Sequence, residues 1–215
     1  MNIKVKICGL RTLEALEAAL DAGADYIGLV FYEASPRNIS HADARILADK
    51  ARGKAKSVAL LVDPDDAAVK RIADEVKPDL IQLHGSETPE RVAQIKQLAQ
   101  TPVMKVIKVG SADDVASASA FSSADIILYD AKSPQDALDA LPGGNGIPFD
   151  WEAFAQVKKG ANFMLSGGLN PDNVRLAIAT TRASMVDVSS GVESAPGVKD
   201  PGLIRSFIAA AKAIS

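Results

Sequence analysis

Cysteine and histidine are scarce in this sequence, which has one cysteine, Cys8, and two histidines among its 215 residues. A single thiol cannot form an internal disulfide, and sparse cysteine is typical of a reducing compartment, so we expect a cytoplasmic protein. The histidines, His41 and His84, are far apart in the chain, and no cysteine or carboxylate cluster has the spacing of metal ligands. The sequence therefore predicts no metal site.

Long apolar runs and an excess of one charge are also missing. No run approaches the roughly 18 apolar residues of a membrane-spanning helix, and the N-terminus lacks the regions of a signal peptide. The formal net charge is −3, with both signs spread along the chain, so no basic patch indicates nucleic acid. We expect neither a membrane nor a nucleic acid as partner. An apolar content of 47% can bury the core of one domain, residues 1–215.

The sequence does contain a regular alternation of short β-branched segments with amphipathic segments. Eight such units in about 200–250 residues are typical of a closed parallel (β/α)8 barrel, known as a TIM barrel. The alternative is an open doubly wound sheet, which would carry a glycine-rich dinucleotide or phosphate signature that Cys8-Gly9-Leu10-Arg11 does not match. We expect strands at Lys4–Cys8, Tyr26–Phe31, Ser57–Val62, Leu80–His84, Val103–Ile107, Ile126–Asp130, Ala161–Ser166 and Met185–Ser189. We expect helices at Thr12–Asp21, His41–Ala51, Asp65–Val76, Pro89–Ala99, Asp113–Ala120, Asp150–Val157, Pro171–Thr180 and Pro201–Ile214.

Strand alternation predicts which side chains point into the barrel, because successive residues of a strand face opposite ways. A buried lysine needs a counter-charge, and Asp187 on the last strand, adjacent to the first in a closed barrel, is our candidate for Lys6. An ammonium near Cys8 would lower the thiol pKa and make it a competent base or nucleophile. In the first strand we expect Ile3, Val5 and Ile7 against helices, and Lys4, Lys6 and Cys8 inside.

Glycines follow the last two expected strands, in Ser166-Gly167-Gly168-Leu169-Asn170-Pro171 and in Asp187-Val188-Ser189-Ser190-Gly191-Val192-Glu193. Either loop alone could be a plain turn. Together, at adjacent carboxyl ends of barrel strands, they are typical of a phosphate site. We expect phosphate to contact Gly167, Gly168, Ser189, Ser190 and Gly191.

Three side chains besides Cys8 are expected at the same face of the barrel: Asp130, Arg37 and His84. Asp130 ends the sixth strand, where it is either a loop-stabilising carboxylate or an acid acting across the cavity from Cys8. Cys8 itself could also be a small buried apolar residue. Arg37, in a loop stiffened by Ser35-Pro36, is a candidate clamp for a substrate carboxylate. The long Gly- and Pro-rich loop from Ala131 to Pro148 is expected to be functional.

His84 ends the fourth strand in Gln82-Leu83-His84-Gly85 and is expected to line the pocket. A Cys–His hydrolase built from Cys8 and His84 is conceivable, but a phosphate site has no evident purpose in one. No role in proton transfer is assigned to His84.

These motifs together resemble phosphoribosylanthranilate isomerase, an enzyme family of tryptophan biosynthesis. The resemblance runs from residue 4 to the last helix, with motifs in order after six of the eight expected strands. It rests on Lys4-Val5-Lys6-Ile7-Cys8-Gly9, Phe31 through Ser35-Pro36-Arg37, Gln82-Leu83-His84-Gly85, Asp130, Phe149-Asp150-Trp151, Ser166-Gly167-Gly168-Leu169 and Asp187 through Glu193.

The resemblance implies an Amadori rearrangement of N-(5′-phosphoribosyl)anthranilate, a small-molecule substrate, without cofactor or metal. By the family pattern Asp130 is the general acid, Cys8 the general base, Arg37 the carboxylate clamp and the two glycine loops the phosphate site. The chain would act as a monomer or a homodimer. Two alternatives are a histidine-pathway barrel isomerase, expected to have an acidic residue where Cys8 stands, and a non-catalytic phosphometabolite-binding barrel.

Overall fold

The computed structural model describes residues 2–131 and 163–213 of the chain. Three predicted features therefore lie outside the described residues: most of the long loop from Ala131 to Pro148, the Phe149-Asp150-Trp151 motif and the helix at Asp150–Val157. Among the described residues, no helix combines the length and the apolar content that crossing a bilayer requires.

Eight parallel strands close into a barrel in chain order, which confirms the predicted (β/α)8 fold and excludes the open doubly wound sheet. Closure occurs where β1 pairs with β8, and the register there sets Lys6 opposite Asp187. The strands are β1 (Lys4–Cys8), β2 (Tyr26–Phe31), β3 (Lys56–Leu61), β4 (Leu80–Leu83), β5 (Val103–Val109), β6 (Ile126–Ala131), β7 (Phe163–Leu165) and β8 (Met185–Val188).

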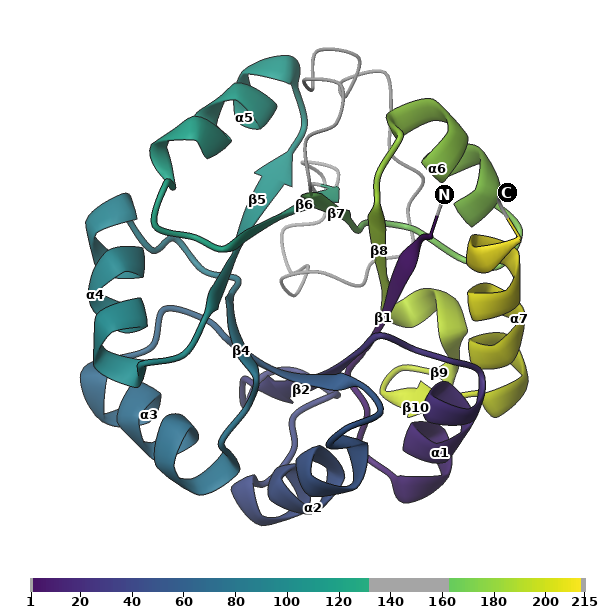
Figure 1. The fold of residues 1–215 in the computed structure, drawn as a ribbon, viewed down its shortest axis with the longest axis horizontal. Coiled ribbons are helices and arrows are strands. Elements are labelled where there is room, and N and C mark those ends of the chain that lie inside the picture. Colours follow the sequence, from purple (N-terminus) through teal and green to yellow (C-terminus); the bar gives the residue numbers. More distant parts are fainter. Residues whose placement is uncertain (1, 132–162, 214–215) are drawn as a thin grey trace.

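Helices surround the barrel on its outside, as Figure 1 shows in the view down its axis. Side-chain caps start several of them at predicted places: Thr12, Ser40 and Thr88 each accept a backbone N–H three residues on. The helices are α1 (Leu13–Asp21), α2 (His41–Ala51), α3 (Asp66–Arg71), α4 (Pro89–Ala99), α5 (Ala112–Ser117), α6 (Val174–Thr181) and α7 (Pro201–Lys212).

Several helices differ from the predicted ranges. The one predicted at Asp113–Ala120 is α-helical over Ala112–Ser117 and continues as a 3-10 helix over Ala118–Ala120. The predicted helix at Asp65–Val76 is α-helical only to Arg71 and continues as a π-helix over Ile72–Val76. Helix α6 begins at Val174 instead of Pro171. Before it, Asn170 Oδ1 accepts the backbone N–H of Asn173, and Asn173 Oδ1 accepts that of Asn170. These side chains satisfy backbone groups that a longer helix would have used.

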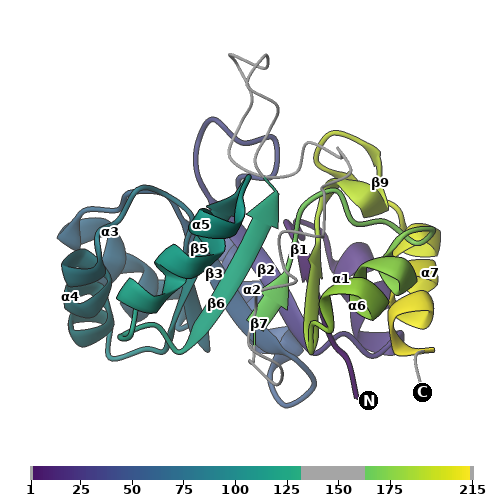
Figure 2. The ribbon, with the colours of Figure 1, turned by 90° about the horizontal axis from the view of Figure 1, so that it is seen from above.

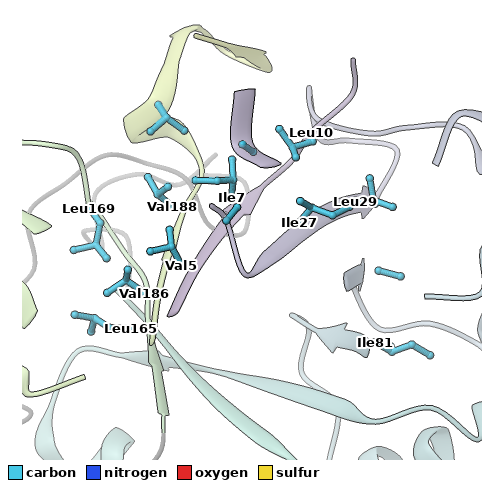
Figure 3. Close-up of a cluster of buried hydrophobic side chains, with 14 of the residues drawn as sticks. Val5, Ile7, Leu10, Ile27, Leu29, Ile81, Leu165, Leu169, Val186 and Val188 are labelled. Carbon is cyan, nitrogen blue, oxygen red and sulfur yellow. The ribbon is translucent and has the colours of Figure 1, made fainter. Parts of the chain in front are cut away.

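The core has two apolar layers, separated by the strands. Inside the barrel a small cluster contains Val58, Met104, Leu128 and Met185. The larger cluster lies between the strands and the helices, and Figure 3 shows Val5, Ile7, Val186 and Val188 within it. The predicted alternation is confirmed in β1, where Val5 and Ile7 pack against the helices and Lys6 and Cys8 face the interior of the barrel.

A hairpin that was not predicted follows β8. A short 3-10 turn at Ser190–Val192 leads into β9 (Glu193–Ala195), which pairs antiparallel with β10 (Val198–Lys199). Gly197 has a φ of 79°, a left-handed conformation that favours glycine. In Figure 2 the arrowhead of β6 points toward the side on which β9 lies, whereas the marked chain ends lie on the opposite side. The hairpin is therefore on the face where the strands end.

Candidate active site

A cavity with about 480 Å³ of empty space, part of it open to solvent, lies at the carboxyl ends of the barrel strands. Most of the residues predicted for the site line it together. The remaining predicted residues, Gly167, Gly168, Ser190 and Gly191, directly follow Ser166 and Ser189 in the chain. The predicted residues on the cavity wall are Cys8, Arg37, His84, Asp130, Asp187 and Ser189, and Ser166 lies beside them.

Cys8 ends β1 above a buried ion pair. Lys6 is fully buried, and its Nζ lies 2.9 Å from Asp187 Oδ1, which confirms the predicted pairing. Burial is the largest single influence and would lower the pKa of Lys6, but the charges of Asp187 and Cys8 and their hydrogen bonds to Lys6 together outweigh it, so the pKa is raised. Lys6 is therefore a cation, held by a carboxylate that also accepts a 3.4 Å hydrogen bond from Ser166 Oγ.

The predicted lowering of the Cys8 pKa is wrong. Burial of the thiol is the largest influence and raises its pKa; Lys6 acts in the opposite direction but does not overcome burial, and Asp187 reinforces the rise. The reason is that Asp187 partly cancels the field of Lys6 at the sulfur, while the site keeps water away from a thiolate. In the structure without substrate, Cys8 favours its thiol form more than an ordinary cysteine does.

Gly28 of β2 makes room for Cys8 and was missed in the sequence. A Cβ at this position would lie 2.8 Å from Cys8 Sγ, too close for any side chain. The carbonyl oxygen of Gly28 also accepts the backbone N–H groups of Gly9 and Leu10, at 2.9 and 3.0 Å. A glycine inside an expected strand signals close approach of another segment, and that signal was available.

Asp130 and His84 meet inside the cavity. Both are buried, and His84 Nε2 lies 3.3 Å from Asp130 Oδ2 without the angular geometry of a hydrogen bond. Within the described part of the chain, neither ring nitrogen of His84 has a hydrogen-bond partner, and the same holds for Oε1 of buried Gln82. Buried polar atoms are normally satisfied. These three atoms thus face a space where ligand groups could bind them.

Arg37 reaches the cavity from the loop between β2 and α2 and is held there by the hairpin. Its Nε and Nη2 donate to the two carboxylate oxygens of Glu193, each at 2.8 Å. Lys199 Nζ lies 2.6 Å from Glu193 Oε1 and donates to the carbonyl oxygen of Ser189 at 2.9 Å. Glu193 and Lys199 were not predicted as site residues, because the contact that brings them to the site joins Glu193 to Arg37, 156 positions away in the chain.

Electrostatics in this cluster keep Glu193 ionised. Burial of Glu193 would raise its pKa, but hydrogen bonding from Arg37 and the charge of Lys199 together lower it. Burial lowers the pKa of Lys199, and the opposing influence of Glu193 is the smaller of the two.

The two glycine loops lie against each other. Gly167 and Gly168 have φ angles of 99° and 65°, in the region that favours glycine. A Cβ on Gly191 would collide with the carbonyl oxygen of Leu169, so the second loop packs on the first through glycine. Ser189 Oγ donates to the carbonyl oxygen of Cys8 at 3.2 Å. Such an arrangement can present backbone N–H groups to an anion. Within the described residues, no group of three His, Cys, Asp or Glu side chains could hold a metal ion.

The whole chain was compared with known protein families and with proteins of known sequence. A family model described as N-(5'phosphoribosyl)anthranilate (PRA) isomerase matches residues 5–210. The chain is 53% identical over 214 residues to an N-(5'-phosphoribosyl)anthranilate isomerase of Rhodopseudomonas palustris (strain BisB5), covering 99% of this chain and 97% of that protein. It is 47% identical over 213 residues to the one of Parvibaculum lavamentivorans, covering 99% of each chain.

Solved structures agree with the sequence relatives. Phosphoribosyl anthranilate isomerase from Thermotoga maritima superposes with a TM-score of 0.87 at 36% identity, covering 99% of this chain and all of that chain (100%). A structure of phosphoribosyl anthranilate isomerase in complex with reduced 1-(o-carboxyphenylamino)-1-deoxyribulose 5-phosphate superposes with a TM-score of 0.85 at 34% identity, with coverage of 99% and 100%.

Proposed function

The chain belongs to the N-(5'-phosphoribosyl)anthranilate isomerase family, and from that premise we propose that Cys8 and Asp130 carry out the Amadori rearrangement of N-(5'-phosphoribosyl)anthranilate. The product is 1-(2-carboxyphenylamino)-1-deoxyribulose 5-phosphate, an intermediate of tryptophan biosynthesis. The observation that carries the proposal is that one cavity is lined by a thiol, a carboxyl group and an arginine, beside two glycine loops. We assign all of residues 1–215 to one domain acting on a small molecule, as a monomer or a homodimer.

Asp130 is the general acid in this proposal. Its proton goes to the furanose ring oxygen of the substrate, the C1′–O bond breaks, and the nitrogen lone pair forms the Schiff base. The buried position of Asp130 beside His84 suits a carboxyl group that must act on a bound substrate and not on bulk water.

Cys8 is the general base. Its thiolate removes the C2′ proton, and the electron pair left on C2′ neutralises the Schiff base to give an enolamine. The enolamine then becomes the ketone as its O2′ proton is lost and C1′ gains one. No atom is added or removed, and the chemistry needs no redox partner. Lys6 is the cation nearest in the chain to the reacting thiolate, whose charged form it stabilises against the cost of burial before the proton is taken.

The substrate is held at its two anionic ends. The guanidinium of Arg37 takes the anthranilate carboxylate, and the loops containing Gly167, Gly168, Ser190 and Gly191 take the phosphate. Gln82 and His84 supply polar atoms to the ribose hydroxyls from the barrel interior.

The deciding experiment is turnover of phosphoribosylanthranilate by the wild type and by Cys8→Ala and Asp130→Asn. Each variant should lose at least about 100-fold in kcat, since a positioned acid or base contributes about that factor or more. Asp25→Asn is the matched control: Asp25 accepts a hydrogen bond from Val5 at the opposite end of the barrel, and its kcat should equal that of the wild type. Near wild-type kcat in either site variant would remove that residue from its role.

A further inference from the structure

Arg37 poses a problem for recognition of a substrate carboxylate, because a carboxylate of the protein already occupies it. Glu193 accepts hydrogen bonds from both Nε and Nη2, each 2.8 Å long, in the bidentate geometry that Arg prefers. Of the five N–H donors of a guanidinium, the other three have no partner among the described residues. An isolated Arg–Glu pair would be neutral and would attract a second carboxylate weakly.

Lys199 changes the charge of this pair. Its side chain is 2% exposed, that of Glu193 is 4% exposed, and their charged atoms are 2.6 Å apart. Two cations and one anion leave one net positive charge in a place that water barely reaches. Burying a lysine at this point costs free energy, so its presence beside an Arg–Glu pair whose hydrogen bonds are already made calls for a reason other than completing those bonds.

We propose that Glu193 and Lys199 are positioning residues for carboxylate recognition: Glu193 orients the guanidinium of Arg37, and Lys199 offsets the charge of Glu193 so that Arg37 still attracts a carboxylate. This inference rests on the role of Arg37 as carboxylate clamp in the proposed function. It adds a specificity device built from the β9–β10 hairpin, whose Lys199 also favours the thiolate of Cys8 through its charge.

The surrounding packing holds this device in place. A Cβ on Gly9, whose φ is 81°, would lie 2.8 Å from Arg37 Cδ, so the arginine stem crosses directly over the end of β1. At the tip of the hairpin, a Cβ on Gly197 would lie 2.5 Å from the carbonyl oxygen of Pro36. Gly197 also donates its backbone N–H to Glu193 at 3.2 Å. The hairpin and the Arg37 loop thus meet at two points, Gly197 against Pro36 and Glu193 against Arg37.

The test compares the affinities of two ligands, the product and its analogue 1-(phenylamino)-1-deoxyribulose 5-phosphate, which lacks the carboxylate. The discrimination factor is the Kd of the analogue divided by that of the product. In the wild type it should be about 10- to 100-fold, the usual contribution of hydrogen bonds to charged groups. Lys199→Met should reduce it at least about fivefold at neutral pH, because the remaining Arg37–Glu193 pair is neutral.

Two rescue variants separate charge balance from a merely structural role. Lys199→Arg keeps the charge and should keep most of the discrimination. The double variant Lys199→Met/Glu193→Gln has one net positive charge again, so its discrimination should return to within about threefold of the wild type. A residue that acts only by holding the hairpin together would give a double variant no better than Lys199→Met.

The control for stability is Lys105→Met. Lys105 is as deeply buried as Lys199, and its Nζ lies 2.6 Å from Glu87 Oε2 on another part of the barrel. This variant should be destabilised but discriminate as the wild type does. Where Lys199→Met does not fold, Lys199→Gln replaces it.

The outcomes distinguish the inference from the function on which it rests. Arg37→Ala should abolish discrimination. Suppose that Arg37→Ala abolishes discrimination. If Lys199→Met then leaves discrimination unchanged, or the double variant shows no recovery, the role of Arg37 as clamp stands and the inference about Glu193 and Lys199 is overturned. If Arg37→Ala leaves discrimination unchanged, both the clamp and the inference fall, whereas the roles of Cys8 and Asp130 are untouched.

Discussion

At the scale of single residues, the protonation state of Cys8 depends on the opposing charges of Lys6 and Asp187 and on the burial of the thiol. Lys6 and Asp187 form a pair directly below the thiol, so the cation that should favour a thiolate brings an anion with it. Burial then raises the pKa of Cys8 above the ordinary value of 9.0. Cys8 is therefore mostly protonated in the free protein at neutral pH, and the base in the proposed mechanism is its minor, thiolate form.

The pH dependence of the reaction should show this state. In the proposed mechanism the active form of Cys8 is the thiolate, and the pKa of this cysteine is raised. At the pH at which an ordinary cysteine is half ionised, kcat/KM should therefore still be rising with pH. Thiolate absorbance of the free protein, with Cys8→Ala as the blank, should rise over the same alkaline range. An absorbance transition centred at or below neutral pH would contradict this prediction.

Strand alternation predicted Lys6 opposite Asp187 because the side-chain period in a strand is strictly two and a closed barrel makes β1 and β8 neighbours. The direction of the Cys8 pKa was not predictable in the same way. It depends on how completely the loops exclude water and on the distance to Asp187, and neither is encoded in local pattern.

At the scale of elements, the loops after β7 and β8 and the β9–β10 hairpin hold residues of the candidate site in place. The glycine loops could be predicted because two of them follow adjacent strands of a barrel, whereas either loop alone could have been a plain turn. The hairpin was missed because its strands, Glu193–Ala195 and Val198–Lys199, are too short for a period of two to stand out. The turn dipeptide Pro196-Gly197 was the available signal.

Packing between the two glycine loops can be tested with Gly191→Ala. The added methyl group would collide with the carbonyl oxygen of Leu169 and push the loops apart. Affinity for inorganic phosphate and for the product should fall at least about 10-fold, a loss comparable to one or two charge-assisted hydrogen bonds. Gly53→Ala is the control, since its φ of 79° strains an alanine but its Cβ has nothing within 4 Å. It should cost about 1 kcal/mol of stability and leave both affinities unchanged.

At the scale of the whole molecule, the Lys6–Asp187 pair joins the first strand to the last. Asp187→Asn leaves an uncompensated cation in the barrel and should lower the free energy of unfolding by about 3–5 kcal/mol. The exposed pair of Lys212 with Asp25 provides the comparison, and Lys212→Met should cost about 1 kcal/mol or less. Urea denaturation measures both, and equal losses would contradict the assigned importance of the buried pair.

The raised pKa of Lys6 fixes the sign of the pH effect on this pair. A group whose pKa is raised by folding contributes stability below its unfolded value of 10.5 and loses that contribution as pH rises through the folded value. Stability from the pair should therefore persist across neutral pH and decline only in strongly alkaline solution.

The same pair has a consequence for the order of events during synthesis. Lys6 and Asp187 are 181 positions apart in the chain, so the ribosome must add all the intervening residues before the counter-charge of Lys6 exists. A nascent barrel lacking β8 would have to bury an unpaired ammonium to close, which is unfavourable by several kcal/mol. Closure before β8 has been translated is thereby discouraged, and the environment of Cys8 is completed only when β8 arrives.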